Sequence, residues 1–262
     1  MGALHRSVTL VALVASGTTS LLAHATEITV FAAGAAKELV TRIETPFTQT
    51  TGHRIKASFD TVGAQRDRVQ QATPDTRPDV VILSSTAIAQ LNKLGLIDAA
   101  SIRDIGDVQV GLAMAATVNA QGPPVPDIST AEALRATLLA AKSIAYADPA
   151  RGATAGTHFA KVLAALGIGD AMAKRTTVLP FGVEVIEAVA AGKYELGVSQ
   201  SSEIVQHQGV RYIGALPPPH QLATRYQIAA IKGSAHGASL AVFTQTDAGR
   251  QASEAGGFAR SR

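Results

Sequence analysis

The sequence predicts an α/β protein built from two doubly wound lobes, with a ligand cleft between them. The first observation is that short apolar strands alternate with amphipathic helices in two successive series. The second is that no low-complexity linker separates the two series. The third is a hydrophobic content of 47% with only 4% aromatic residues, which predicts a large core of aliphatic side chains.

The first series contains three strand–helix units. Strands are predicted at 27–33, 54–59 and 79–83, and helices at 36–49, 64–71 and 86–94. Strand 79–83 is apolar enough to be buried on both faces of a parallel sheet. Gly52 and Gly95 follow two of the helices and predict their C-terminal ends. Three such units in a row are typical of a doubly wound parallel sheet.

The second series repeats this alternation with longer intervals. Strands are predicted at 108–116, 143–147 and 194–198, and helices at 154–166 and 183–191. Ser129 or Thr130 can cap a further helix that runs to residue 141. A late strand at 225–231 and a helical tail at 238–255 complete the chain. The pattern predicts crossings between the lobes near Gly111 and Ala229, so lobe I comprises 26–110 and 229–262, and lobe II comprises 111–228.

The N-terminus has the pattern of a cleaved signal peptide, predicted at 1–25. His5 and Arg6 begin it, the apolar run 8–15 follows, and small residues precede a cleavage site after Ala25. The alternative is a membrane anchor, but the apolar run is too short to span a bilayer. An exported chain without cysteine predicts a bacterial periplasmic protein whose core needs no disulfides.

Composition and motifs exclude several function classes. The formal net charge is +3, or about +2 without Arg6, which is too small and too dispersed for nucleic-acid binding. The chain has no cysteine, and its histidines show no metal-ligand spacing. Dinucleotide, Walker and nucleophile-elbow motifs are absent. We therefore expect no cofactor and no metal, and we expect a monomer that binds a small anion.

Four turns between strands and helices are small or polar, and they are the predicted ligand contacts. Ligands of open α/β sheets bind beyond the carboxyl ends of the strands. Helix starts there present unpaired N–H groups and partial positive charge, and small residues let an anion come close. The predicted contacts are Gly34, Ala35, Thr61, Gly63, Thr154, Ala155, Gly156 and Gln200.

Charged side chains near these turns supply further candidates. Arg66 and Arg151 can each grip a carboxylate with parallel hydrogen bonds. Asp60, His158 and Glu184 are the candidates for acid–base work, if the protein is an enzyme. Asp60 can instead be a turn cap and Glu184 a helix N-terminal charge. The sequence does not rank these three residues.

The chain resembles the periplasmic molybdate-binding proteins over nearly the whole mature sequence. The likeness rests on 28–33, on Ser58-Phe59, on 78–82, on Ala147-Asp148-Pro149 with Ala155-Gly156, and on 196–198. The resemblance implies a type II periplasmic binding fold that closes on its ligand by a hinge motion.

The sequence departs from that family at the residues that hold its ligand. The family's hydroxyl side chains at the first two turns are replaced by Gly34-Ala35 and by Val62-Gly63-Ala64, although Thr61 remains. The family's tyrosine near the fourth turn is replaced by Gln200. These departures favour a carboxylate over a compact metal oxyanion.

A more distant branch of the fold, which includes a periplasmic aconitate isomerase, is similar at three places. They are 126–129, Tyr146-Ala147-Asp148, and Gln200 with Ser202-Glu203. This resemblance implies a cofactor-free transfer of a proton across an allylic system.

Two hypotheses for function remain at this point. The first is a receptor that delivers a di- or tricarboxylate to an ABC importer, and the second is an aconitate isomerase. The receptor is favoured because the fold is far more often used in that way, which is an argument from fold alone. A molybdate or tungstate receptor is the least favoured reading.

Overall fold

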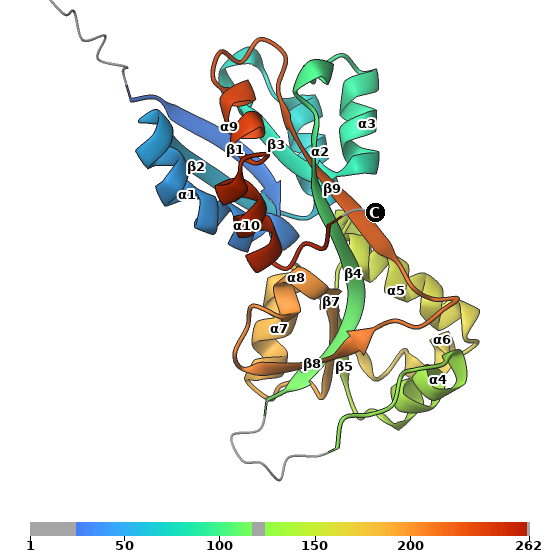
Figure 1. Cartoon of the computed structure of the whole chain (residues 1–262). Coiled ribbons are helices and arrows are strands. Elements are labelled where there is room, and N and C mark those ends of the chain that lie inside the picture. Colours follow the sequence, from blue (N-terminus) through green and yellow to red (C-terminus); the bar gives the residue numbers. More distant parts are fainter. Residues whose placement is uncertain (1–24, 117–123, 261–262) are drawn as a thin grey trace, which may run out of the picture.

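The computed structural model describes residues 25–116 and 124–260, so the predicted signal peptide lies outside the described residues except for Ala25. The described strands form one sheet in the order β2-β1-β3-β9-β4-β7-β5-β6, and β8 pairs with β4. Figure 1 shows two α/β parts, one above the other, joined where β4 and β9 run side by side. We call the part that contains β1 lobe I and the part that contains β5 lobe II.

Lobe I begins with the three predicted strand–helix units. They are β1 (Glu27–Ala33), α1 (Lys37–Thr51), β2 (Arg54–Asp60), α2 (Val62–Gln71), β3 (Val80–Ser84) and α3 (Ser85–Lys93). Strand β1 pairs in parallel with β2 and β3, as expected for a doubly wound sheet. The ends of these elements follow local rules: Gly52 ends α1 with a φ of 77°, and Thr61 caps α2 by accepting a hydrogen bond from Ala64 N at 3.1 Å.

The end of the chain completes lobe I. Strand β9 (Ala223–Ala230) pairs antiparallel with β3, and helices α9 (Gly237–Phe243) and α10 (Asp247–Ala255) follow. Figure 1 shows α1, α9 and α10 on one side of the sheet and α2 and α3 on the other. This double cover explains why every residue of β3 is buried.

Lobe II has the same layered construction. Its elements are β4 (Arg103–Ala115), α4 (Ala131–Ala140), β5 (Ile144–Ala147), α5 (Thr154–Ala165), α6 (Gly169–Met172), β6 (Thr176–Leu179), α7 (Gly182–Ala190), β7 (Leu196–Gln200), α8 (Ser201–Ile204) and β8 (Val210–Ala215). One hydrophobic cluster packs α4, α5 and α6 against the sheet, and a second packs α7 and α8 against its other face. The predicted cap of α4 is Thr130, which accepts from Ala133 N at 3.1 Å.

Strand pairing locates the connection between the lobes. In β4, residues Arg103 to Gln109 pair with β9, and residues from Val110 onward pair with β7. The change is one residue from the predicted crossing at Gly111. Strand β9 already pairs with the first half of β4 at Ala223, so we propose the second crossing just before Ala223 instead of near Ala229. The exact lobe limits stay a prediction.

Several elements differ from the sequence-based prediction. Strands β6 and β8 were not predicted, and β4 begins at Arg103 instead of residue 108. The hydrophobic pattern did not predict this start, because Asp104 and Asp107 are polar. Their side chains face Arg225 on β9 instead of the core. The helical tail is broken at Thr244–Thr246 into α9 and α10.

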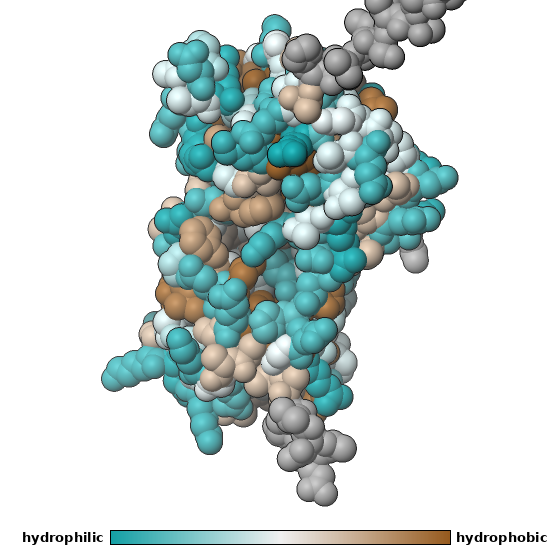
Figure 2. Space-filling view, turned by 90° about the vertical axis from the view of Figure 1, so that its left-hand side faces the viewer, coloured by the Kyte–Doolittle hydropathy of each residue, from teal (hydrophilic) through white to brown (hydrophobic). Residues whose placement is uncertain are grey.

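The described surface carries no extended apolar patch on the face in Figure 2, where hydrophilic side chains prevail and hydrophobic ones lie singly or in small groups. Among the described residues, no helix combines the length and the apolar character that crossing a membrane requires.

Candidate functional site

A cavity of about 310 Å³ lies where the two lobes meet. It is lined by residues at the carboxyl ends of β1, β2, β5 and β7 and by the first residues of α1, α2, α5 and α7. Both lobes therefore contribute helix starts, whose free N–H groups favour negative charge. The volume is at the small end of the range for small-molecule sites.

The structure places eight of the predicted site residues in this lining. They are Gly34, Ala35, Asp60, Thr61, Thr154, Ala155, Glu184 and Gln200. All four predicted turns are thus represented, although their role in binding stays a prediction. The remaining five predicted residues, Gly63, Arg66, Arg151, Gly156 and His158, lie elsewhere.

Arg66 lies outside the cavity lining, which does not support the expectation that it grips a ligand. Its guanidinium binds Asp67, with an Nη2–Oδ1 distance of 2.7 Å, and donates to Gln90 Oε1 on α3 at 3.2 Å. These contacts hold the side chain between α2 and α3.

His158 is also placed away from the cavity. Its Nε2 atom lies 2.7 Å from the carbonyl oxygen of His220, in the segment that precedes β9. This contact holds His158 of α5 against the segment before β9, so the structure does not support a role for it at the cavity, and that role stays a prediction.

Gly156 serves the packing of lobe II. A Cβ atom at this position would overlap the carbonyl oxygen of Ala147 at the end of β5. Only glycine lets α5 start this close to the strand, which places Thr154 and Ala155 at the cavity.

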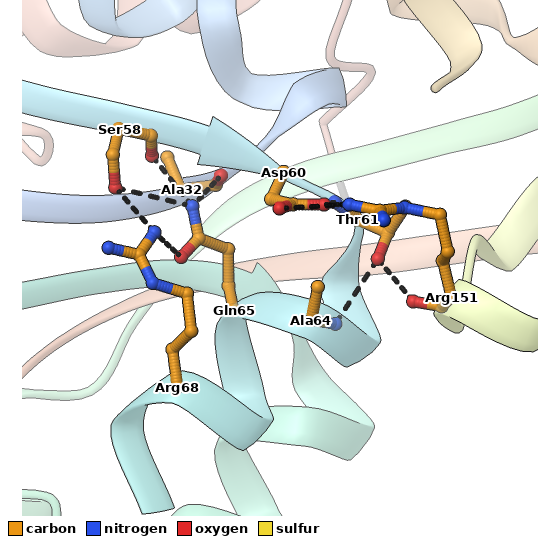
Figure 3. A network of polar contacts seen from close by, with 8 residues as sticks. All are labelled: Ala32, Ser58, Asp60, Thr61, Ala64, Gln65, Arg68 and Arg151. Carbon is orange, nitrogen blue, oxygen red and sulfur yellow. Dashed lines mark hydrogen bonds and ion pairs between the residues drawn. The ribbon is translucent and has the colours of Figure 1, made fainter. Parts of the chain in front are cut away.

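Arg151 and Gly63 belong to a direct contact between the lobes, and Figure 3 shows the part of it that Asp60, Thr61 and Arg151 form. Arg151 lies in the turn η4 (Pro149–Arg151) of lobe II, and its Nη2 donates to Asp60 Oδ1 of lobe I at 3.0 Å. Thr61 Oγ1 donates to the carbonyl oxygen of Arg151, and Gly63 N donates to that of Gly152 at 3.2 Å. The Arg151 guanidinium also lies 4.8 Å from the ring centre of Phe181. The Asp60 carboxylate is therefore paired and is a poor candidate for a base.

Gln200 is the most unusual polar residue of the lining. Its side chain is only 4% exposed, yet neither its amide nitrogen nor its amide oxygen has a hydrogen-bond partner among the described residues. An unpaired buried amide costs about 1–3 kcal/mol. In a cavity wall, such an amide is able to form hydrogen bonds with a molecule that enters the cavity.

Glu203 forms part of the cavity floor and was not among the residues predicted from the sequence. Its Oε2 atom accepts hydrogen bonds from Ser199 Oγ and from Gln200 N, the second at 3.3 Å. No lysine or arginine pairs with it within the part of the chain that is described. Burial raises the pKa of the Glu203 carboxyl, and the bonds from Ser199 and Gln200 only partly oppose this shift.

Tyr226 of β9 is the second residue of the cavity floor, by which we mean Glu203 and Tyr226. It is 1% exposed, its ring packs edge-on against Phe258 with centroids 5.7 Å apart, and its hydroxyl is hydrogen-bonded to Thr154. Burial, and then the nearby Glu203 charge, raise the pKa of the Tyr226 hydroxyl far above its ordinary value. The phenol therefore stays protonated and can donate a hydrogen bond into the cavity.

Sequence reasoning missed these floor residues for identifiable reasons. Glu203 lies in the fourth predicted turn, after strand β7, so the sequence placed it near the site. The sequence did not indicate that its side chain is partly buried there. Tyr226 lies inside a strand where an aromatic residue is ordinary core. Lys37, the first residue of α1 after the first turn, lines the cavity too and is its one lysine or arginine among the described residues.

The charges of the lining are mixed. Asp60 is balanced by Arg151 of the opposite lobe, and Lys37 has no ion pair among the described residues. Glu184 and Glu187 lie on α7, where Glu187 is exposed. The lining therefore offers amides, helix starts and Lys37 to a ligand, with Glu203 beside them, and no arginine belongs to it among the described residues. Within the described residues, no group of three or more His, Asp or Glu side chains is arranged to hold a metal ion.

A family model matches residues 28–259, and its description is bacterial extracellular solute-binding protein. An aconitate isomerase from a Pseudomonas species is 26% identical over 234 residues, which cover 88% of this chain and 85% of that protein.

Solved structures show the same architecture. The periplasmic molybdate-binding protein of Azotobacter vinelandii superposes with a TM-score of 0.72 at 17% identity, covering 90% of this chain and all of that one. The sulfate-binding protein SubI of Mycobacterium tuberculosis gives 0.64 at 19% identity, covering 89% and 86%. These likenesses confirm the predicted type II periplasmic binding fold.

Proposed function

Because this chain belongs to the bacterial extracellular solute-binding protein family, we propose that it captures a small di- or tricarboxylate between its lobes. The observation that carries the proposal is the unpaired, buried amide of Gln200 in the cavity wall. An amide NH₂ group and helix-start N–H groups are donors that suit a carboxylate without requiring a counter-ion.

The hydroxyl groups of the site support a carboxylate over a compact metal oxyanion. Thr61 donates to the Arg151 carbonyl, and Ser199 donates to Glu203. Thr154 is hydrogen-bonded to Tyr226. These hydroxyls are engaged within the protein, so an array of serine and threonine donors around a tetrahedral anion is not left over for binding.

A binding screen tests this proposal. Purified protein is titrated calorimetrically with cis-aconitate, trans-aconitate, citrate, molybdate and sulfate. We expect micromolar binding of at least one carboxylate and none of molybdate or sulfate, because four or five hydrogen bonds to a charged ligand suffice for that affinity. Binding of molybdate alone would contradict the proposal.

Within this function, the first candidate role is that of a periplasmic receptor for an ABC importer. The family match and the solute-binding structural neighbours support it. We propose that residues 1–25 direct export and are then removed. The receptor requires binding and hinge closure only, so bound carboxylate should be released chemically unchanged.

The second candidate role is an aconitate isomerase. Two observations favour it: the Pseudomonas relative that carries this name, and the partly buried Glu203 carboxyl that lines the cavity. The experiment incubates cis-aconitate with the protein and follows trans-aconitate by proton NMR. Interconversion supports the isomerase, whereas tight binding without any conversion supports the receptor.

A further inference from the structure

We infer from the geometry that the Glu203 carboxyl moves a proton between two carbons of an unsaturated carboxylate bound in the cavity. This inference rests on the proposed carboxylate site and adds to it the group that does chemistry there. Asp60, His158 and Glu184 were the sequence-based candidates, and only Glu184 lines the cavity without a partner in the described part of the chain.

Backbone turns of both lobes lie against the Glu203 carboxyl. A Cβ atom on Gly34 of lobe I would lie 2.8 Å from Glu203 Oε1, and one on Gly182 of lobe II would overlap Oε2. The carboxyl is therefore in contact with two backbone turns that line the cavity, one from each lobe. A ligand that fills the space between those turns meets this carboxyl.

The two oxygens of the carboxyl differ in their surroundings. Both hydrogen bonds, from Ser199 Oγ and Gln200 N, are made to Oε2. Oε1 accepts no hydrogen bond from any described residue. One oxygen is thus anchored and the other is available to a ligand, which is the arrangement that a positioned general base requires.

The electrostatic surroundings tune this carboxyl toward proton exchange. The titratable groups that line the cavity around it are Tyr226, Asp60, Glu184, Glu187 and Lys37, and only Lys37 is cationic. Burial raises the pKa of the Glu203 carboxyl above its ordinary value, which is the direction in which enzymes shift carboxyls that act as general acids and bases. A receptor gains nothing from such a group, because an ionised Glu203 repels the anion bound beside it.

The step is balanced without a cofactor. Ionised Glu203 takes a proton from a methylene carbon that lies between a carboxylate and a C=C bond. The electron pair of the broken C–H bond forms a new C=C bond to the neighbouring carbon, and the former π pair takes the proton back from Glu203 at the far carbon. Helix-start N–H groups, Gln200 and Lys37 stabilise the charge that develops on the carboxylates in between.

The test uses Glu203→Gln with cis-aconitate in D₂O, and proton NMR follows exchange of the methylene hydrogens. We expect wild type to exchange them and Glu203→Gln to lose at least a hundredfold in rate, since general acid–base groups contribute about 10²–10⁴-fold. Calorimetric affinity of the variant should stay within about threefold. The matched control is Glu132→Gln, an exposed carboxylate on α4, which should exchange like wild type.

Two further readouts separate chemistry from folding. The wild-type rate should rise with pH as Glu203 ionises, and Glu203→Asp should retain this profile at reduced rate because it keeps a carboxylate. Equal exchange by wild type and Glu203→Gln would overturn the inference. Binding of cis-aconitate without exchange in wild type would overturn it and leave the proposed function standing, whereas absence of carboxylate binding would overturn both.

Discussion

Single polar side chains of the cavity connect the stability of this protein with its proposed binding of a ligand. Gln200 and Glu203 lie next to each other in the cavity, one with both polar atoms unpaired and the other with one anchored oxygen. The Gln200 side chain costs free energy in the ligand-free protein, because buried polar groups without partners are unfavourable. A ligand that bonds to the Gln200 amide would remove this cost.

Replacing Gln200 tests this balance directly. Gln200→Leu should raise the free energy of unfolding by about 1–3 kcal/mol, because it removes two unsatisfied polar atoms from a buried position. The same variant should lose at least tenfold in carboxylate affinity. Urea denaturation measures the first effect and calorimetry the second.

The control for this variant is Gln70→Leu on the exposed face of α2, which should change stability by less than about 0.5 kcal/mol. A Gln200→Leu protein that is less stable than wild type would mean that the amide has partners in solution that the described contacts do not include.

For single residues, the sequence predicted which positions line the cavity better than it predicted what each side chain contacts. Small turn residues such as Gly34 and Thr154 line the cavity, because the ends of parallel strands meet at one edge of a sheet. Arg66 illustrates the limit: its spacing from Thr61 placed it near the site, but Asp67 and Gln90 hold its side chain away. The partial burial of Glu203 depends on a backbone turn of the opposite lobe, at Gly34, which no local pattern can indicate.

The helices and strands were predictable where local rules act alone. Caps such as Thr130 and stops such as Gly52 follow from side-chain and backbone preferences. Strands β6 and β8 were missed because each gains its stability from pairing: β6 with β5 and β8 with the far end of β4. Their sequences are short and only partly buried, so hydrophobic periodicity is weak.

The junction of β5 and α5 gives a prediction at the scale of elements. Gly156→Ala should destabilise the fold by about 1–3 kcal/mol or more, because the new methyl group overlaps the Ala147 carbonyl and pushes α5 from the strand. Thermal unfolding followed by circular dichroism measures the change.

Gly169→Ala, at the start of α6, is the matched control. A Cβ atom there meets nothing within 4 Å, so stability should hold or rise. If both variants unfold at the same temperature, the close approach of α5 to β5 does not exist in solution.

On the scale of the whole molecule, the two lobes are joined at two places. Strands β4 and β9 connect the lobes, and the contact between α2 and η4 joins them at a second place, beside the cavity. The sequence predicted two lobes and a crossing in β4, since α/β alternation fixes the layers. It did not predict the contact, because residues 60–63 and 151–152 are far apart in the chain and their meeting depends on the angle between the lobes.

Gly63→Ala tests whether this contact holds the cavity closed. A Cβ atom there would lie 2.7 Å from Gly152 Cα and 3.0 Å from the Arg151 carbonyl oxygen, both backbone atoms that cannot rotate away. The strain is relieved when the lobes separate, so the ligand-free variant should have a larger radius of gyration by small-angle X-ray scattering. Helix α2 itself should not suffer, because alanine is favoured over glycine in a helix by about 1 kcal/mol. Gly169→Ala should scatter like wild type. Identical scattering by Gly63→Ala would show that the lobes are already apart in solution and that the contact forms only on closure around a ligand.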